Sequence, residues 1–281
     1  MTQTLFKSEA AQVTVYLDAP RWSGEPTAAL GQFSCKSLDA GCDVITQAID
    51  FIRTEQITRI IGPMDGDTWH SYRFVTKTDH SPAFLMEPSN SDIATQVFEK
   101  TGFAPISRYF SARGSLSDAG KSTPADNVAL TVEMWDGTDP EALFKQVYDL
   151  SIAAFENNAF YKPINFDAFL KMYMPVVPVL KKELVFFART ADKKLAGFLF
   201  AIPNYNEGPM PKSVILKTYA SLQKGAGQLL AHAFHTTARD LGFETAIHAL
   251  IHDDNLSALR SAAEGAEIFR RYALFGLQLD G

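Results

Sequence analysis

The chain has 281 residues, of which 46% are hydrophobic and 21% are charged, and its formal net charge is −6. This composition is ordinary for a globular protein and allows one large domain or two of moderate size. The acidic balance disfavours nucleic acid and anionic membrane surfaces as partners. The polar start and the lack of a long apolar run predict no signal peptide or transmembrane helix, and Cys35 and Cys42 indicate reduced thiols in a cytoplasmic protein.

The first segment, residues 1–115, alternates short strand patterns with amphipathic helices. We expect strands at 13–17, 28–34, 57–61 and 106–112, and helices at 42–54 and 91–100. Small and polar residues with Pro124 then interrupt the apolar periodicity, so residues 116–126 are predicted to be an interdomain linker.

The second segment, residues 127–281, carries a longer series of elements. A strand at 128–134 precedes a helix that Asp139 and Pro140 are well suited to begin and that extends to about residue 155. The patterns then predict a helix at 166–173, strands at 184–189, 195–202 and 213–220, a helix at 228–241, a strand at 245–251, a short helix at 256–263 and a last strand at 268–279. This order indicates an α+β fold with a central, mostly antiparallel sheet flanked by helices. The first segment repeats the order in truncated form, without the opening strand and two helices.

The turn that follows the strand at 213–220 has a chemical use. It reads Gln223-Lys224-Gly225-Ala226-Gly227 and leads directly into a helix. Backbone N–H groups at such a helix start point outward beside the positive end of the helix dipole, and they can bind a pyrophosphate. Glycine lets the backbone approach the phosphates closely, although many turns of this kind are purely structural.

Residues 215–230 resemble the central motif of the GNAT acetyltransferase superfamily, a strand followed by Arg/Gln-x-x-Gly-x-Gly/Ala and a helix. The run Asn255-Leu256-Ser257-Ala258-Leu259 is similar to the family's Asn-x-x-(Ser/Ala)-x-Leu helix. The resemblance implies that acetyl-CoA is a co-substrate. It further implies that the backbone of Tyr219, Ala220 and Ser221 binds the pantetheine arm, that amides from Gln223, Lys224, Gly225, Ala226 and Gly227 hold the pyrophosphate, and that Asn255 contacts the CoA arm.

The sequence departs from this family pattern in the phosphate turn and at a position that matters for proton transfer. Leu222 stands where the family has Arg or Gln, and Arg260 stands where many members have a tyrosine that protonates the leaving thiolate. Tyr219 and Tyr272 are candidates for the acid because they lie near the right strands, although a tyrosine packed in a sheet is the ordinary alternative. No residue is assigned as the base.

A dense polar run follows the strand at 57–61. Asp65, Asp67, Trp69, His70, Tyr72 and Arg73 lie within nine positions, and we expect them to bind the substrate. An equally good interpretation is an ordered loop whose aromatic residues seal the domain interface. Together with residues 84–90 and 97–103, the run resembles the N-terminal half of uncharacterised bacterial tandem-GNAT proteins. The corresponding first-segment turn, residues 38–43, holds two carboxylates and one glycine, so we expect a single CoA per chain.

These features favour an acetyl-CoA-dependent N-acetyltransferase that acts on a primary amine of a small molecule or a peptide. The alternative is a non-catalytic acyl-CoA-binding protein of the same fold. An aminoacyl transferase that uses aminoacyl-tRNA is disfavoured by the acidic balance. His232, His235, His248 and His252 could suggest a metal site, but they lack a matching triad and we expect none. An exposed last strand would permit a homodimer.

Overall fold

The computed structural model describes residues 3–117, 129–255, 258, 261–262 and 265–280. Its first part contains β1 (Gln3–Lys7), β2 (Ala11–Tyr16), β3 (Thr27–Cys35), α1 (Leu38–Thr54), β4 (Arg59–Gly62), β5 (Phe74–Thr78), α2 (Ala94–Lys100) and β6 (Ala104–Ser115). Its second part contains β7 (Leu130–Met134), α3 (Pro140–Phe155), α4 (Phe166–Tyr173), the 3-10 helices η1 (Met174–Val179), η2 (Lys182–Leu184) and η3 (Tyr205–Glu207), β8 (Val185–Thr190), β9 (Leu195–Pro203), β10 (Ser213–Ser221), α5 (Ala226–Asp240), β11 (Thr245–His252) and β12 (Glu267–Gln278).

All of these strands belong to one sheet, in the order β1-β2-β3-β4-β12-β6-β11-β10-β9-β8-β7, with β5 paired to β12 beside this path. Among the described pairs, β3–β4 and β10–β11 are parallel and the others are antiparallel. A mixed α+β fold with a mostly antiparallel central sheet, as predicted, is therefore confirmed. The parallel pairs are joined by α1 and α5, so each part of the chain contains one β-α-β unit.

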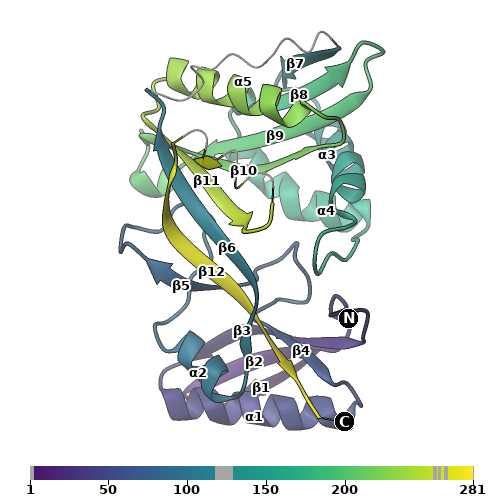
Figure 1. Cartoon of the computed structure of the whole chain (residues 1–281), viewed down its shortest axis with the longest axis vertical. Coiled ribbons are helices and arrows are strands. Elements are labelled where there is room, and N and C mark those ends of the chain that lie inside the picture. The colour runs from purple at the N-terminus through teal and green to yellow at the C-terminus, as the bar shows by residue number, and fades with distance from the viewer. Residues whose placement is uncertain (1–2, 118–128, 256–257, 259–260, 263–264, 281) are drawn as a thin grey trace.

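The two longest strands, β6 and β12, join the two parts of the molecule (Figure 1). β6 is the last strand of the first part, yet Ser115 at its end pairs with Thr245 of β11. β12 is the last strand of the chain, and Phe275 near its end pairs with Gly62 of β4. Each segment sends its last strand into the other segment's half of the sheet. The predicted division into residues 1–115 and 127–281, with a truncated first domain, stays a prediction.

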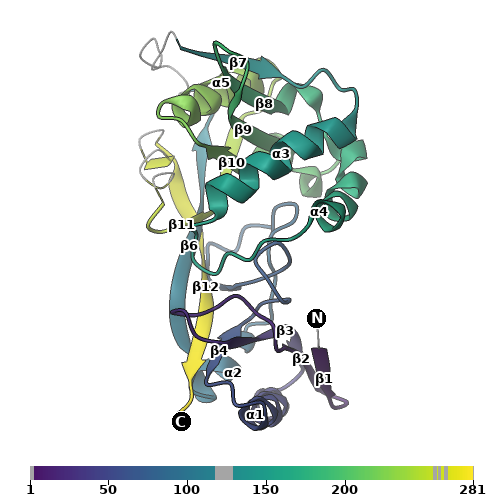
Figure 2. The same ribbon diagram turned by 90° about the vertical axis from the view of Figure 1, so that its right-hand side faces the viewer.

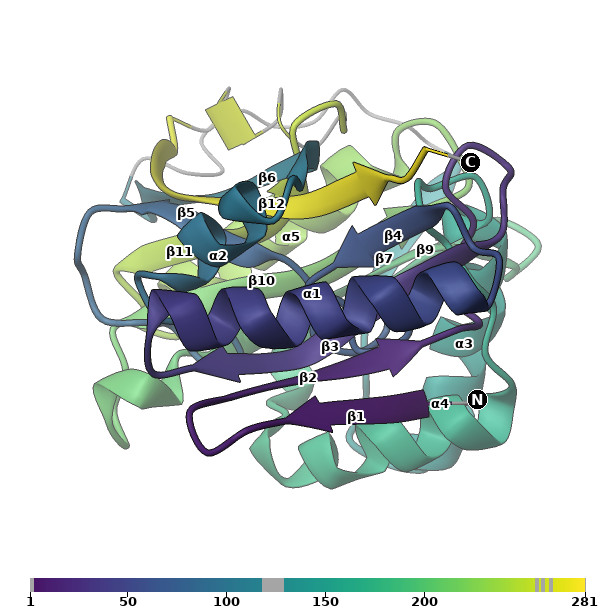
Figure 3. The same cartoon turned by 90° about the horizontal axis from the view of Figure 1, so that it is seen from below.

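Helices cover the sheet on both faces, and residue alternation along the strands explains how. In the second part, Phe186 and Ala188 pack in the core beneath α5, whereas Val185 and Phe187 pack in the core beneath α3 and α4. Successive side chains of a strand point to opposite faces, so α5 and α3 lie on opposite sides of the sheet (Figure 2). In the first part, α1 lies across the face of β2 and β3 (Figure 3).

The helix starts follow the capping chemistry that their sequences predict. Asp139 accepts a hydrogen bond from the Ala142 amide at 3.0 Å, with Pro140 at the first helical position of α3, as expected. Ser37 caps α1 in the same way, and Asn165 caps α4. These side chains satisfy amides that have no partner inside their own helix.

Several sequence expectations need correction. β1 and β5 were not expected: β1 has an exposed, alternating edge pattern, and β5 has a single ladder, with β12. α5 begins at Ala226, two residues before the predicted start, and α2 begins at Ala94 instead of residue 91. The linker at 116–126 and the helix at 256–263, including Arg260, lie largely outside the described residues.

The expectation of an exposed last strand is also wrong, whereas the homodimer that such a strand would permit stays a prediction. β12 is internal to the sheet, between β4 and β6, and the ends of the sheet are β1 and β7. In the part of the chain that the structure describes, no helix combines the length and apolar character needed to cross a bilayer.

Candidate active site

The predicted glycine turn lies between β10 and α5 and differs from the other helix starts. Gly225 occupies the cap position of α5 with a φ of 90°, a conformation that favours glycine. Because Gly225 has no side chain, α5 begins without a side-chain cap, in contrast to α1, α3 and α4. The Ala226 amide donates to the Gln223 carbonyl at 3.2 Å, so this one of the five predicted amides is engaged within the turn. The geometry leaves the positive end of α5 available to an anion.

The parallel strands β10 and β11 separate as they approach this turn. Their pairing covers Ser213–Leu216 with 245–248 and then ends, although β10 continues to Ser221 and β11 to His252. On its other edge β10 stays paired with β9, through a bulge at Lys217. β11 stays paired with β6 through its own bulge after His248, where Leu250 has a φ of 58°. A gap therefore opens between the two strands beside Tyr219, Ala220 and Ser221.

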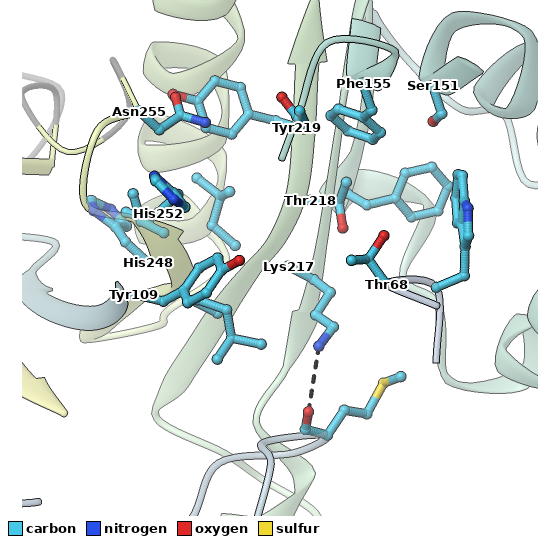
Figure 4. A pocket seen from close by; sticks show the side chains of 18 of the residues that line it. Thr68, Tyr109, Ser151, Phe155, Lys217, Thr218, Tyr219, His248, His252 and Asn255 are labelled. Carbon is cyan, nitrogen blue, oxygen red and sulfur yellow. Dashed lines mark hydrogen bonds between the residues drawn. The ribbon is translucent and has the colours of Figure 1, made fainter. Parts of the chain in front are cut away.

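This gap opens into a cavity of about 1450 Å³ that is lined by both parts of the chain. One wall comes from β10, α5, β11 and Asn255, and the opposite walls come from α3, α4 and the loop between β4 and β5. Figure 4 shows Tyr219 and Asn255 extending toward each other across the gap, with Lys217, Thr218 and Thr68 on the side of the first-part loop. A ligand in the gap would thus meet residues from segments far apart in the sequence.

Some of the predicted site residues line the cavity and others do not. Tyr219 and Asn255 line the cavity, as do the first-part residues Asp65, Trp69, His70, Tyr72 and Arg73. Ala220, Ser221 and the turn at 223–227 do not line the cavity themselves. Asp67 is fully buried behind the wall, where its Oδ1 atom accepts the Nδ1 hydrogen of His70 at 2.7 Å and the Trp69 amide at 2.9 Å. Asp67 thereby orients His70, and it does not itself face a ligand.

The loop also seals the contact between the two parts of the chain, which was the alternative interpretation of its aromatic residues. The Trp69 indole N–H donates to the Lys162 carbonyl at 2.8 Å. The Trp69 ring meets Phe169 of α4 edge-on at 5.7 Å. The two roles are compatible, because the ring that anchors the loop on α4 also forms part of the cavity wall.

The first β-α-β unit has no comparable gap because its own chain fills the space. The Met64 amide donates to the Leu30 carbonyl, and the Asp65 carboxylate accepts the Gln32 amide at 2.7 Å. A Cβ on Gly31 would lie only 2.4 Å from the Met64 carbonyl oxygen, so only glycine permits this approach. Ser37 also caps the α1 helix start. These contacts support the expectation of one CoA per chain.

Tyr272, a candidate acid, is packed in the core and does not line the cavity. Its hydroxyl donates to Glu87 and lies 3.0 Å from the Ser111 hydroxyl. Burial, followed by the hydrogen bond to Glu87, raises the pKa of Tyr272. This is the position of a structural tyrosine, which leaves Tyr219 as the candidate that a ligand can reach.

Lys217, Tyr109 and His252 are among the polar residues of the cavity that were not predicted to bind a ligand there. Burial, followed by the nearby charge of Arg73, lowers the pKa of Lys217 to about 8. Burial raises the pKa of Tyr109 to about 12. His252 accepts the Asp254 amide at Nδ1, which leaves the Nε2 hydrogen to the Ser107 hydroxyl at 3.1 Å. The sequence did indicate Lys217, because it is a charged residue between Leu216 and Thr218 inside the strand pattern of β10.

Two of the four histidines, His235 and His248, form a pair. The Nε2 atoms of His235 and His248 are 3.0 Å apart, and His248 Nδ1 lies 2.8 Å from the Ser261 hydroxyl. Burial lowers the pKa of His248 to about 3, so this ring is neutral at neutral pH. The described residues include no group of three or more metal-binding side chains.

No protein-family model and no curated protein matches the sequence. The fold is nevertheless similar to solved acetyltransferase structures. A GCN5-related N-acetyltransferase from Sphaerobacter thermophilus has a TM-score of 0.56 and 13% identity, over 97% of this chain and 78% of its own. A tandem GNAT protein from the clavulanic acid biosynthesis pathway has a TM-score of 0.58 and 14% identity, over 99% and 84%. A GCN5-related N-acetyltransferase from Anabaena variabilis has a TM-score of 0.54 and 9% identity, over 95% and 59%. The chain therefore has the fold of the GNAT superfamily, that of the GCN5-related N-acetyltransferases.

Proposed function

We propose that the protein is an acetyl-CoA-dependent N-acetyltransferase that moves an acetyl group to a primary amine of a small molecule or a peptide. The observation that carries this proposal is the gap between β10 and β11, which runs from a glycine-capped helix start to a large cavity. The gap suits a long, thin ligand with an anionic end, and the cavity has room for a second reactant. GNAT-fold neighbours support acyl transfer as the reaction.

The residues present fit acetyl-CoA along this path. The start of α5 would hold the pyrophosphate through backbone amides of the turn at 223–227, with Lys224 adding positive charge at the rim. The β11-facing edge of β10 beyond Leu216 has left the parallel ladder, so backbone groups near Tyr219 and Ala220 would hydrogen-bond the pantetheine arm. Asn255 would contact the same arm from the other side of the gap.

The reaction is attack of the acceptor nitrogen on the thioester carbonyl carbon, with cleavage of the carbon–sulfur bond and transfer of the nitrogen's proton, through solvent or side chains, to the CoA sulfur. The walls of the cavity would hold the two reactants together, which supplies much of the rate in such a reaction. Backbone N–H groups of β10 beyond the bulge would stabilise negative charge on the carbonyl oxygen. Tyr219 is the hydroxyl on this strand that we assign to protonate the sulfur, because it lines the cavity.

A thiol-release assay with acetyl-CoA and a panel of primary amines tests the proposal. We expect amine-dependent release of CoA together with the N-acetylated product by mass spectrometry. The exposed side chain of Leu222, at the position where the family has Arg or Gln, favours the alternative of a non-catalytic acyl-CoA-binding protein. Saturable acetyl-CoA binding without turnover of any amine would establish that alternative.

A further inference from the structure

Arg73 is a buried cation in the wall of the cavity with an unusual environment. Its guanidinium lies between two rings, 3.8 Å from the centroid of Tyr72 and 4.1 Å from that of Tyr109. Its side chain donates to the Leu250 carbonyl at 3.2 Å, and its Nε–H group has no hydrogen-bond partner in the described structure. Arg73 is 8% exposed, and its φ of 74° is unfavourable for a residue with a side chain. The fold thus holds a strained arginine at this place.

Lys217 is a second cation that lines the cavity. It projects from the bulge of β10 toward the loop between β5 and α2, where its amino group donates to the Met86 carbonyl at 3.4 Å (Figure 4). It is half-buried, and the Arg73 charge is close enough to make protonation of Lys217 less favourable. The β4–β5 loop, which carries Arg73, and β10 therefore bring two like charges near each other, which is unfavourable unless an anion balances them.

The charge of Glu87 raises the pKa of Lys217, but it only partly offsets burial and the Arg73 charge, and the carboxylate is paired elsewhere. Glu87 accepts from the Arg270 guanidinium at 2.5 Å and from the Tyr272 hydroxyl, and its side chain is fully buried. In the part of the chain that the structure describes, no carboxylate forms an ion pair with Arg73 or Lys217. A buried cation without a counter-charge is costly, and an incoming carboxylate would relieve that cost.

Much of the remaining lining of the cavity is apolar or aromatic. It comes from α3, α4, η1 and β9, and its half-buried side chains include Phe155, Met172, Tyr173, Val176 and Phe200. Such a surface releases water when an apolar group covers it. The cavity therefore offers a ligand both cationic groups and an apolar surface.

We propose that the acceptor is an amine that also carries a carboxylate and an apolar or aromatic group, with the carboxylate bound by Arg73 and Lys217 and the apolar group placed against α3 and α4. This inference rests on the proposed acetyl transfer for the role of the amine, but the carboxylate site does not depend on it. Charge-assisted hydrogen bonds to a guanidinium and an ammonium are among the stronger polar contacts available in a protein.

Isothermal titration with 3-phenylpropionate tests the site directly, because this probe has the carboxylate and the ring but no amine to acetylate. We expect it to bind at least about tenfold more tightly than the neutral 3-phenyl-1-propanol. Lys217→Met should weaken the binding of 3-phenylpropionate by about tenfold or more and leave the affinity for the alcohol unchanged. Lys217→Arg should restore most of the affinity for 3-phenylpropionate. Lys212→Met is the matched control, since Lys212 is exposed and pairs with Glu244. Circular dichroism checks that each variant is folded.

Equal affinity for the acid and the alcohol, or an unchanged carboxylate affinity in Lys217→Met, would overturn the proposal. If inorganic phosphate competes as well as the organic acid, the pair is a general anion site and the acceptor assignment fails. If Lys217→Met weakens the binding of acetyl-CoA by the same factor, the cations serve the co-substrate and the proposal is wrong.

Failure of acetyl transfer alone, with selective carboxylate binding intact, would instead count against the enzyme function. If transfer occurs, phenylalanine should exceed phenethylamine in kcat/KM by about tenfold, and that preference should disappear in Lys217→Met.

Discussion

Replacing Lys217 with methionine should stabilise the ligand-free protein. The fold lowers the pKa of Lys217 from 10.5 to about 8, first by burial and then through the Arg73 charge. At about 1.4 kcal/mol per pKa unit, this corresponds to roughly 3 kcal/mol by which the folded state disfavours the ammonium. Water in the cavity screens part of that cost, so we expect Lys217→Met to raise the free energy of unfolding by about 1–2 kcal/mol at pH 7. Methionine keeps the length of the side chain and introduces no charge.

The same pKa shift predicts how the stability difference between the wild type and Lys217→Met changes with pH. Below pH 8 the lysine is protonated in both the folded and the unfolded chain, so its full cost is present. Between pH 8 and 10.5 the folded chain loses the proton first, and the unfolded chain then binds more protons, so the wild type gains stability as the pH rises. The advantage of Lys217→Met should therefore shrink across this window. Arg73 keeps its charge throughout, and Glu87 stays paired with Arg270.

Urea unfolding of wild type and variant, followed by tryptophan fluorescence at pH 7 and pH 10, measures both quantities. Comparing the two proteins at each pH cancels the titration of groups that they share. Lys212→Met, at an exposed ion pair, should change stability by less than about 0.5 kcal/mol at either pH. A variant less stable than the wild type at pH 7, or a difference that does not change with pH, would refute the assignment of Lys217 as a half-buried cation whose charge the fold disfavours.

Three further substitutions test the other parts of the site. Tyr219→Phe should lower kcat by about tenfold to a hundredfold with little change in acetyl-CoA affinity, as measured by thiol release and titration, and an unchanged kcat would remove Tyr219 as the acid. Lys224→Glu should weaken acetyl-CoA binding several-fold, whereas Lys193→Glu in the exposed β8–β9 turn should not; equal effects would contradict a pyrophosphate at the glycine turn. Tyr272→Phe should cost about 1–3 kcal/mol of stability by urea titration, because Glu87 loses a buried hydrogen bond, and leave acetyl-CoA binding intact; a selective loss of kcat would contradict its structural assignment.

The fold could be predicted from the sequence wherever local chemistry decides the structure. Asp139 with Pro140 marked the start of α3, and the glycine turn marked the start of α5 to within two residues. β1 and β5 escaped prediction because a short strand at or beside an edge needs no apolar face of its own. The crossing of β6 and β12 between the two parts depends on pairings across the chain, which local periodicity does not contain.

The candidate site shows the same division. Tyr219 and Asn255 were found through a motif, and the loop at 65–73 through its density of polar and aromatic residues. The loop's approach to the β10–β11 gap, and the separation of the two strands there, are properties of the three-dimensional arrangement. Lys217 acquires its meaning only when Arg73 of the first part is placed beside it. Tyr272 lies near the right strands in sequence, but its side chain points into the core.

The central claim is that the gap between β10 and β11 binds one acetyl-CoA, and isothermal titration with acetyl-CoA tests it most directly. The account predicts saturable binding of one molecule per chain. Ala231→Phe should weaken this binding by about tenfold or more, because Ala231 lines the cavity from α5 and the added ring would obstruct it. Ala153→Phe, on an exposed position of α3, should have no such effect. No binding at millimolar acetyl-CoA, or binding that Ala231→Phe leaves unchanged, would contradict the account.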